Sequence, residues 1–154
     1  MSEFSLVDKF SAHHRRLLLI CDELEAIADS LPDRVCGQKC LRLARGLGAT
    51  MTDAQQLEES KIFPTLLALE PLREELVGTL EQLRSDHHHD LCYAEEVQET
   101  LRAYGEGRRS VSPDAAGFML RGFFEGLRRH IAFEQHLIGP LLHLAEGRTM
   151  SVRH

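Results

Sequence analysis

Four long amphipathic segments, separated by short turn-forming stretches, constrain the fold of this chain more than any other feature. Within each segment, apolar residues recur at steps of three and four, which is the spacing of one face of an α-helix. Pro-containing turns at 31–33 and 70–71 and a Gly- and Ser-containing stretch at 104–112 separate the segments. The predicted helices therefore cover residues 2–30, 34–69, 72–103 and 113–145.

Composition and loop length extend this prediction to a fold class. Leu contributes 25 residues, whereas Val and Ile together contribute 11, which favours helices over strands. Short connections favour antiparallel neighbours, so we predict an all-α, up-down-up-down antiparallel four-helix bundle. The 154 residues suit a single domain, which we assign to residues 1–145, followed by a polar C-terminal tail at 146–154. Pro64 is expected to kink or end the second helix.

Charge and hydropathy argue against several classes of partner. The 18 basic and 24 acidic residues give a net charge of −6, which disfavours binding to nucleic acid. No apolar run approaches the length of a membrane-spanning helix, so no membrane association is expected. The N-terminal residues lack the basic and apolar regions of a secretory signal, and the four Cys then suggest thiols in a cytoplasmic protein. Either a monomer or a homodimer is compatible with the sequence.

Ionisable residues interrupt the apolar seam of every predicted helix. A single histidine on such a seam is usually a hydrogen-bonded core residue, but interruptions on all four helices make that explanation poor. Burying an unpaired carboxylate costs several kcal/mol or forces it to take up a proton. A metal ion removes this penalty, and imidazole with carboxylate donors suits iron, manganese or zinc. The candidate metal ligands are His14, Glu58, His87, His130 and Glu134.

Helical phase selects these residues from their neighbours. His130 and Glu134 stand four residues apart, so both side chains can reach one metal from the same helix face. In the triple His87-His88-His89, successive side chains diverge by about 100°, so only one can face the core, and the seam favours His87. The seam of the fourth helix is expected to run through Phe123, Leu127, His130, Glu134, Leu137 and Leu141.

Four short motifs share their order and spacing with a known family. They are Ala12–Leu17 (AHHRRL), Leu57–Pro64 (LEESKIFP), Leu83–His87 (LRSDH) and His130–Glu134 (HIAFE), the last followed by Pro140. Together they resemble the hemerythrin-like domains of the HHE cation-binding class, over about residues 8–145.

The resemblance implies a four-helix bundle that holds a carboxylate-bridged non-haem di-iron centre. It assigns Glu58 and Glu134 as bridging carboxylates, His87 and His130 as ligands of one metal, and His14 as a ligand of the other.

One departure from the family pattern affects the expected stoichiometry. The second helix of the family carries His-x3-Glu, but Ala54 stands four residues before Glu58. The metal nearest His14 therefore lacks its second imidazole. Three outcomes remain open: two metals with water or Gln55 in the gap, a single metal at His87 and His130, or a degenerate site.

Three functions of different classes follow from these expectations. The first is a metal-binding module that binds or senses a small diatomic ligand, O2 or NO, at non-haem iron. The second is a redox enzyme, or an iron donor for the repair of damaged metal centres. The third is a degenerate bundle that acts as an interaction module. No nucleophile, phosphate loop or substrate pocket is evident, so a non-enzymatic role is favoured over an enzymatic one.

Overall fold

The computed structural model describes residues 4–152, and all its regular elements are helices. Helix α1 spans Leu6–Ser30, α2 spans Gly37–Leu57, α4 spans Arg73–Gly105 and α5 spans Pro113–Val152. Between α2 and α4, a π-helical turn η1 (Glu58–Ile62) and a short helix α3 (Phe63–Leu67) continue the course of α2. Residues 4–152 contain no strand, so the predicted all-α class is confirmed.

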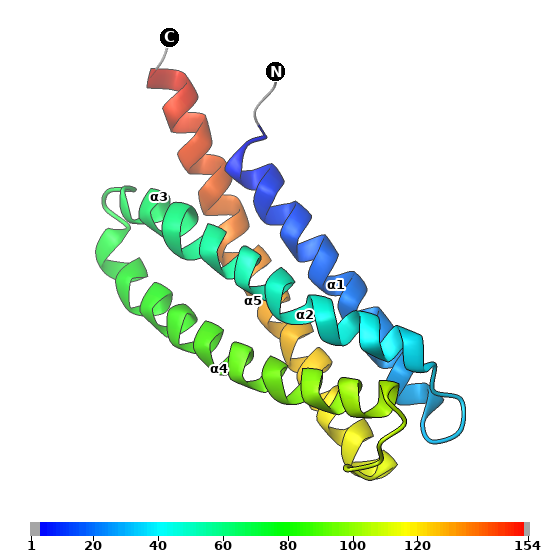
Figure 1. The fold of residues 1–154 in the computed structure, drawn as a ribbon. Helices are drawn as coiled ribbons and strands as arrows, with labels where there is room; N and C mark the ends of the chain where they lie inside the picture. Colours follow the sequence, from blue (N-terminus) through cyan, green and yellow to red (C-terminus); the bar gives the residue numbers. More distant parts are fainter. Residues whose placement is uncertain (1–3, 153–154) are drawn as a thin grey trace.

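The four helical columns run alternately up and down, as predicted (Figure 1). Helix α1 contacts α2 and α5, and α4 contacts α2 and α5, which closes the bundle. The first turn of α1 and the end of α5 meet at one end of the molecule (Figure 1). There the backbone N–H of Val7 donates to Glu146 Oε1 at 3.1 Å, so a residue of the predicted tail caps the first helix.

Local sequence signals fix several helix ends. Ser5 caps α1 by accepting a hydrogen bond from the backbone N–H of Asp8, and Ser112 accepts the corresponding bond from Ala115 at the start of α5. Pro113 occupies the first position of α5, where its missing N–H has no cost. Gly107 turns the chain after α4 with a φ of 78°, a conformation that other residues rarely adopt.

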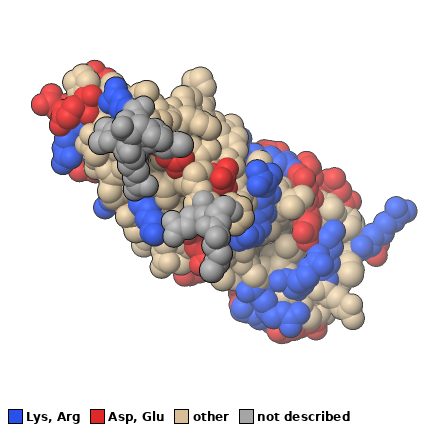
Figure 2. All heavy atoms as spheres, turned by 90° about the horizontal axis from the view of Figure 1, so that it is seen from above, with Lys and Arg blue, Asp and Glu red and all other residues tan. Residues whose placement is uncertain are grey.

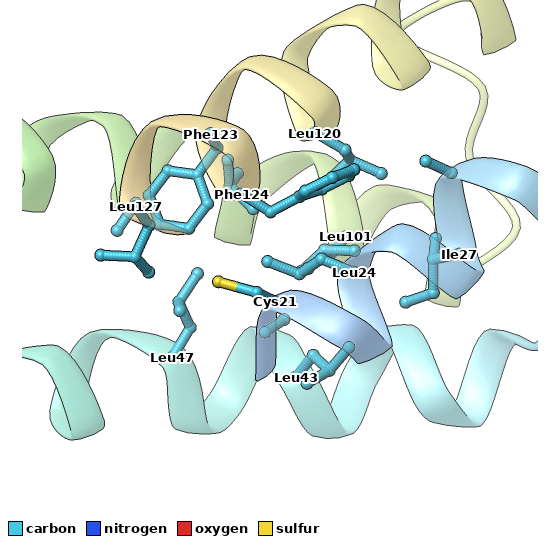
Figure 3. Close-up of a cluster of buried hydrophobic side chains, with 14 of the residues drawn as sticks. Cys21, Leu24, Ile27, Leu43, Leu47, Leu101, Leu120, Phe123, Phe124 and Leu127 are labelled. Carbon is cyan, nitrogen blue, oxygen red and sulfur yellow. The ribbon is translucent and has the colours of Figure 1, made fainter. Parts of the chain in front are cut away.

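The apolar core consists of two clusters stacked along the bundle. One cluster lies toward the α1–α2 and α4–α5 connections, and the side chains labelled in Figure 3 point into it from all four columns. The other includes Phe10, Phe63, Leu83 and Ile138. On α1, for example, Phe10 belongs to one cluster and Leu17 to the other, with buried His14 between them. The predicted ligands therefore form a polar layer that separates two apolar layers.

Two sequence expectations need correction. Pro64 does not end the second column, because the backbone widens into the η1 turn just before Pro64 and stays helical through Leu67. The C-terminal half of the α5 seam is also shifted: Leu137 and Leu141 are partly buried, and the fully buried line runs through Ile131, Glu134, Ile138 and Leu142. A three-four pattern admits both choices, because the apolar stripe is wide enough to include adjacent positions.

The end of α5 differs from the tail expected at 146–154, since the helix continues to Val152. None of the helices within residues 4–152 is long and apolar enough to cross a membrane. On the face drawn in Figure 2, basic and acidic side chains lie side by side.

The four cysteines are all free thiols: Cys21, Cys36, Cys40 and Cys92. Burial raises the pKa of Cys21 to about 12, so this thiol stays protonated.

Candidate metal centre

All five predicted ligands meet in the polar layer, and each helical column contributes at least one of them. His14 comes from α1, Glu58 is the first residue of η1, His87 comes from α4, and His130 and Glu134 come from α5. His14, Glu58, His87 and Glu134 are each at most 3% exposed. The His130 side chain is 14% exposed, so it is the most accessible of the five.

The imidazole and carboxylate groups approach each other closely. His87 Nε2 lies 2.9 Å from Glu58 Oε2, and His130 Nε2 lies 2.7 Å from Glu134 Oε1. His14 Nε2 lies 3.3 Å from Glu58 Oε1 and 3.8 Å from Glu134 Oε1. Each carboxylate therefore stands between imidazoles of different helices, as a bridging ligand would.

These atoms form two overlapping groups that could each hold a metal ion. One group is His87, His130 and Glu134, and the other is His14, Glu58 and Glu134; within each group the donor atoms lie within 4.8 Å of one another. Glu134 belongs to both groups. The arrangement has the donor chemistry of a two-metal site with a shared carboxylate, or of one metal beside a weaker position.

Unsatisfied buried atoms indicate that the cluster fits a cation. His87 Nε2, although close to Glu58, lacks hydrogen-bond geometry, and Glu134 Oε2 has no hydrogen-bond partner either. Leaving such atoms unpaired in a core costs about 1–3 kcal/mol each. A metal ion would engage both atoms at once, so the residues present fit a metal centre.

The two buried carboxylates shift in opposite directions. Burial, followed by the neighbouring Glu134, raises the pKa of Glu58. Burial would also raise the pKa of Glu134, but its neighbours Glu58, His130 and His14 outweigh burial and lower that pKa. The opposite shifts reflect the cost of ionising two adjacent buried carboxylates together.

The pKa values of the three imidazoles are all raised. Burial alone would lower the pKa of His14, but the neighbouring carboxylates of Glu134 and Glu58 raise it to about 9. Burial likewise opposes a charge on His87, and Glu58 raises its pKa to about 9. The pKa of His130 is raised by Glu134 against the effect of burial. In the metal-free protein, protons on these imidazole nitrogens take the place of a bound cation and supply its positive charge.

Two acidic residues lie behind the imidazoles: the sequence predicts Glu59 as a support for the ligands or a surface residue, and it did not single out Asp90. Glu59 Oε2 lies 3.3 Å from His87 Nδ1, and Asp90 Oδ2 lies 3.9 Å from His130 Nδ1. Asp90 follows His87 by three residues, which places both on one face of α4, and this spacing could have identified it. Glu59 follows Glu58 directly, about 100° round a regular helix, and its orientation here depends on the widened η1 turn. By contrast, His14 Nδ1 is buried without a hydrogen-bond partner.

Ala54 lines a small cavity beside the candidate ligands. The cavity has a volume of about 10 Å³, which is room for about one water-sized molecule. Leu17, Met51 and Leu127 supply part of its apolar wall. Gln55 also lines it, and the Gln55 amide nitrogen donates to the His87 carbonyl oxygen at 3.1 Å. The imidazole missing at position 54 thus leaves a space, and Gln55 ties α2 to α4 beside it.

The other histidines fall where helical phase placed them. His88 and His89 are exposed on the outside of α4, and His13 is only partly buried beside buried His14.

Comparison with known proteins agrees with the geometry. The searches of curated proteins and of solved structures gave no match. Residues 5–142 match the family described as the hemerythrin HHE cation-binding domain. This match includes all five candidate ligands and spans all four helical columns. The chain belongs to the hemerythrin HHE cation-binding domain family.

Proposed function

We propose that this protein binds non-haem iron in the polar layer of the bundle and uses it to bind or sense a small diatomic ligand, O2 or NO. The observation that carries this proposal is the pair of overlapping donor groups that share Glu134. Manganese or zinc would find the same donors, so the choice of iron rests on the family relationship and the carboxylate-rich donor set.

The residues of such a site would have different roles. His87, His130 and the two glutamates would hold the stronger metal position, and His14 would serve a second one. Bound iron supplies an open coordination position and a reversible change of oxidation state. The apolar walls from Leu17, Met51 and Leu127 keep bulk water away, and the cavity beside Ala54 has room for a molecule no larger than about one water.

We expect the two positions to differ in affinity. The first position draws on two imidazoles as well as carboxylates, whereas the His14 position has one imidazole because Ala54 offers no donor. Loss of one imidazole ligand should weaken binding by orders of magnitude unless a water compensates.

Anaerobic titration with Fe(II) of protein purified without a histidine tag tests the proposal. We expect one tight equivalent and a second that is weak or undetectable. His130→Ala should abolish the tight equivalent, whereas His14→Ala should leave it largely intact. His136→Ala, an exposed position on the same helix as His130, is the matched control.

Two readouts accompany the titration. Metal at about 100 times its dissociation constant should stabilise the fold by about 2.7 kcal/mol. For a chain of this size, that corresponds to a rise in melting temperature of roughly 5–10 °C. Visible spectra after exposure to O2 or NO test ligand binding. A protein that takes up no metal and shows no thermal shift would instead be the degenerate interaction bundle.

A further inference from the structure

A groove between α4 and α5 opens on the surface beside the metal centre. Its volume is about 320 Å³. Asp86, His89 and Asp90 line it from α4, and Gly122 and Gly126 line it from α5. Of the five ligands of the proposed centre, only His130 lines this groove, so metal coordination alone does not account for the groove.

The inner end of the groove reaches the centre. Asp90, Leu127 and His130 line both the groove and the small cavity among the ligands, so these three side chains form the wall between them. His130 is 14% exposed, whereas the side chains of His14, Glu58, His87 and Glu134 are each at most 5% exposed. The centre therefore comes nearest to solvent at His130, at the end of this groove.

Specific contacts keep the groove open. The Tyr93 hydroxyl donates to the Met119 carbonyl oxygen at 2.9 Å and so bridges α4 and α5 at one side of the groove. A Cβ atom at Gly122 would lie 2.7 Å from that hydroxyl, so any larger residue here would displace it. A Cβ atom at Gly126 would meet only the Arg129 guanidinium, at 3.9 Å, which leaves space for a side chain that the sequence does not supply.

The charges of the groove suit a cation. Asp86 and Asp90 stand four residues apart on α4 with His89 beside them, so two carboxylates and an imidazole occupy one wall. The glycines opposite carry no charge, and Arg129 is a basic group close to Gly126. A cleft with carboxylates on a low-dielectric wall raises the local concentration of cations and speeds their association.

From these observations we propose that the α4–α5 groove is the route by which a divalent metal cation reaches the buried centre. Asp86 and His89 attract the hydrated ion, and Asp90 and His130 receive it where the groove meets the ligand cavity. This inference rests on the proposed metal-binding function and adds the path of loading to it.

A steric variant tests the route. In Gly126→Leu the new side chain fills open space in the groove, and loss of a helical glycine favours the helix. We expect stopped-flow loading with Co(II), followed by its visible absorption, to slow by about tenfold or more, since access to a site limits its association rate. The equilibrium affinity for Co(II) and the helical content should stay unchanged. Gly139→Leu, on the same helix with no atom near its Cβ, is the matched control and should load at the original rate.

A charge variant tests whether the groove guides a cation. Asp86→Asn keeps the shape of the side chain and lies outside the ligand set; it should slow Co(II) loading several-fold and weaken the salt dependence of the rate. Unchanged loading in Gly126→Leu would overturn the route, and unchanged loading in Asp86→Asn would overturn its role as a cation path. Failure of the unmodified protein to bind Co(II) at equilibrium would instead overturn the proposed function itself.

Discussion

The environment behind each imidazole differs among the three histidines of the centre. His87 has Glu59 at 3.3 Å from its Nδ1, and His130 has Asp90 at 3.9 Å, whereas His14 Nδ1 is buried without a hydrogen-bond partner. A carboxylate behind a ligating imidazole fixes its tautomer and makes the opposite nitrogen a better metal ligand. Of the two histidines assigned to the stronger position, His87 has a carboxylate within hydrogen-bond distance, and His130 has one at ion-pair distance.

Removing this support should weaken the tight metal position. We expect Glu59→Gln and Asp90→Asn each to lower the affinity of the tight equivalent by about 10- to 100-fold, measured by competition with a chelator. The Co(II) absorption spectrum of the remaining complex should shift, because the imidazoles lose their fixed orientation.

Glu95→Gln serves as the control, since Glu95 is an exposed carboxylate on the same helix as Asp90. Equal affinities in all three variants would show that the outer carboxylates do not position the ligands.

Position 54 decides the strength of the second metal position. Ala54→His restores a fourth imidazole one helical turn before Glu58, so the second Fe(II) equivalent should bind at least about tenfold more tightly. The cavity of about 10 Å³ is smaller than an imidazole, so the metal-free variant should lose about 1–3 kcal/mol of stability through overpacking. Isothermal titration and denaturant unfolding measure the two effects. A second equivalent unaffected by the new histidine would contradict the assignment of His14 to its own metal.

At the scale of the helix, the π turn η1 sets the orientation of the two adjacent glutamates. The backbone N–H of Phe63 donates to the Glu58 carbonyl oxygen, a five-residue step that replaces the regular four-residue step. Pro64 follows immediately and has no N–H to offer the Ser60 carbonyl oxygen, and its ring would crowd that carbonyl in a regular helix. We attribute the π turn to this proline.

Replacing the proline should therefore change the metal centre without unfolding the helix. In Pro64→Ala the restored N–H favours a regular α-turn, which rotates Glu58 and Glu59 relative to His87. We expect metal affinity to fall several-fold while the melting temperature of the metal-free protein stays the same or rises. Pro140→Ala, also an exposed proline within a helical column, is the control and should leave metal affinity unchanged. If metal affinity is unaltered in both variants, the π turn does not contribute to metal binding.

At the scale of the whole molecule, a layer of ionisable side chains crosses the bundle between two apolar clusters. The apolar clusters stabilise the fold from both sides, and the layer between them carries paired charges that burial disfavours. In the metal-free protein the carboxylates raise the pKa of His14 and His87 to about 9, so opposite charges pair within the layer. Metal and protons therefore compete for the same groups.

This competition predicts proton release on metal binding. At pH 7 the imidazoles of His14 and His87 are protonated, and they must lose their protons to bind a metal, so filling both positions should release about two protons or more. Calorimetric titration with Co(II) in two buffers of different ionisation enthalpy measures the number released.

The same pKa shifts determine how the stability of the metal-free protein changes with pH. Because both folded-state pKa values lie above the ordinary value of 6.5, their stabilising contribution is complete below pH 6.5 and is lost as the pH rises through about 9. Metal binding that showed no dependence on the buffer would exclude protonated imidazoles in the metal-free centre.

The helices, their order and the inward face of most of them could be predicted from the amino-acid sequence. Local signals of hydrophobic spacing, proline, glycine and capping residues suffice for this, because an amphipathic helix must bury its apolar stripe. Helical phase also singled out His14, Glu58, His87, His130 and Glu134, which the fold brings into one layer.

The arrangement of that layer could not be predicted in this way. The overlap of the two donor groups at Glu134, the roles of Glu59 and Asp90 behind the imidazoles, and the groove beside His130 depend on distances between helices that are remote in sequence. The shift of the α5 seam from Leu137 and Leu141 to Ile138 and Leu142 has the same origin. A periodic pattern defines the face of a helix only to within about one residue, whereas packing against three neighbouring helices fixes its rotation.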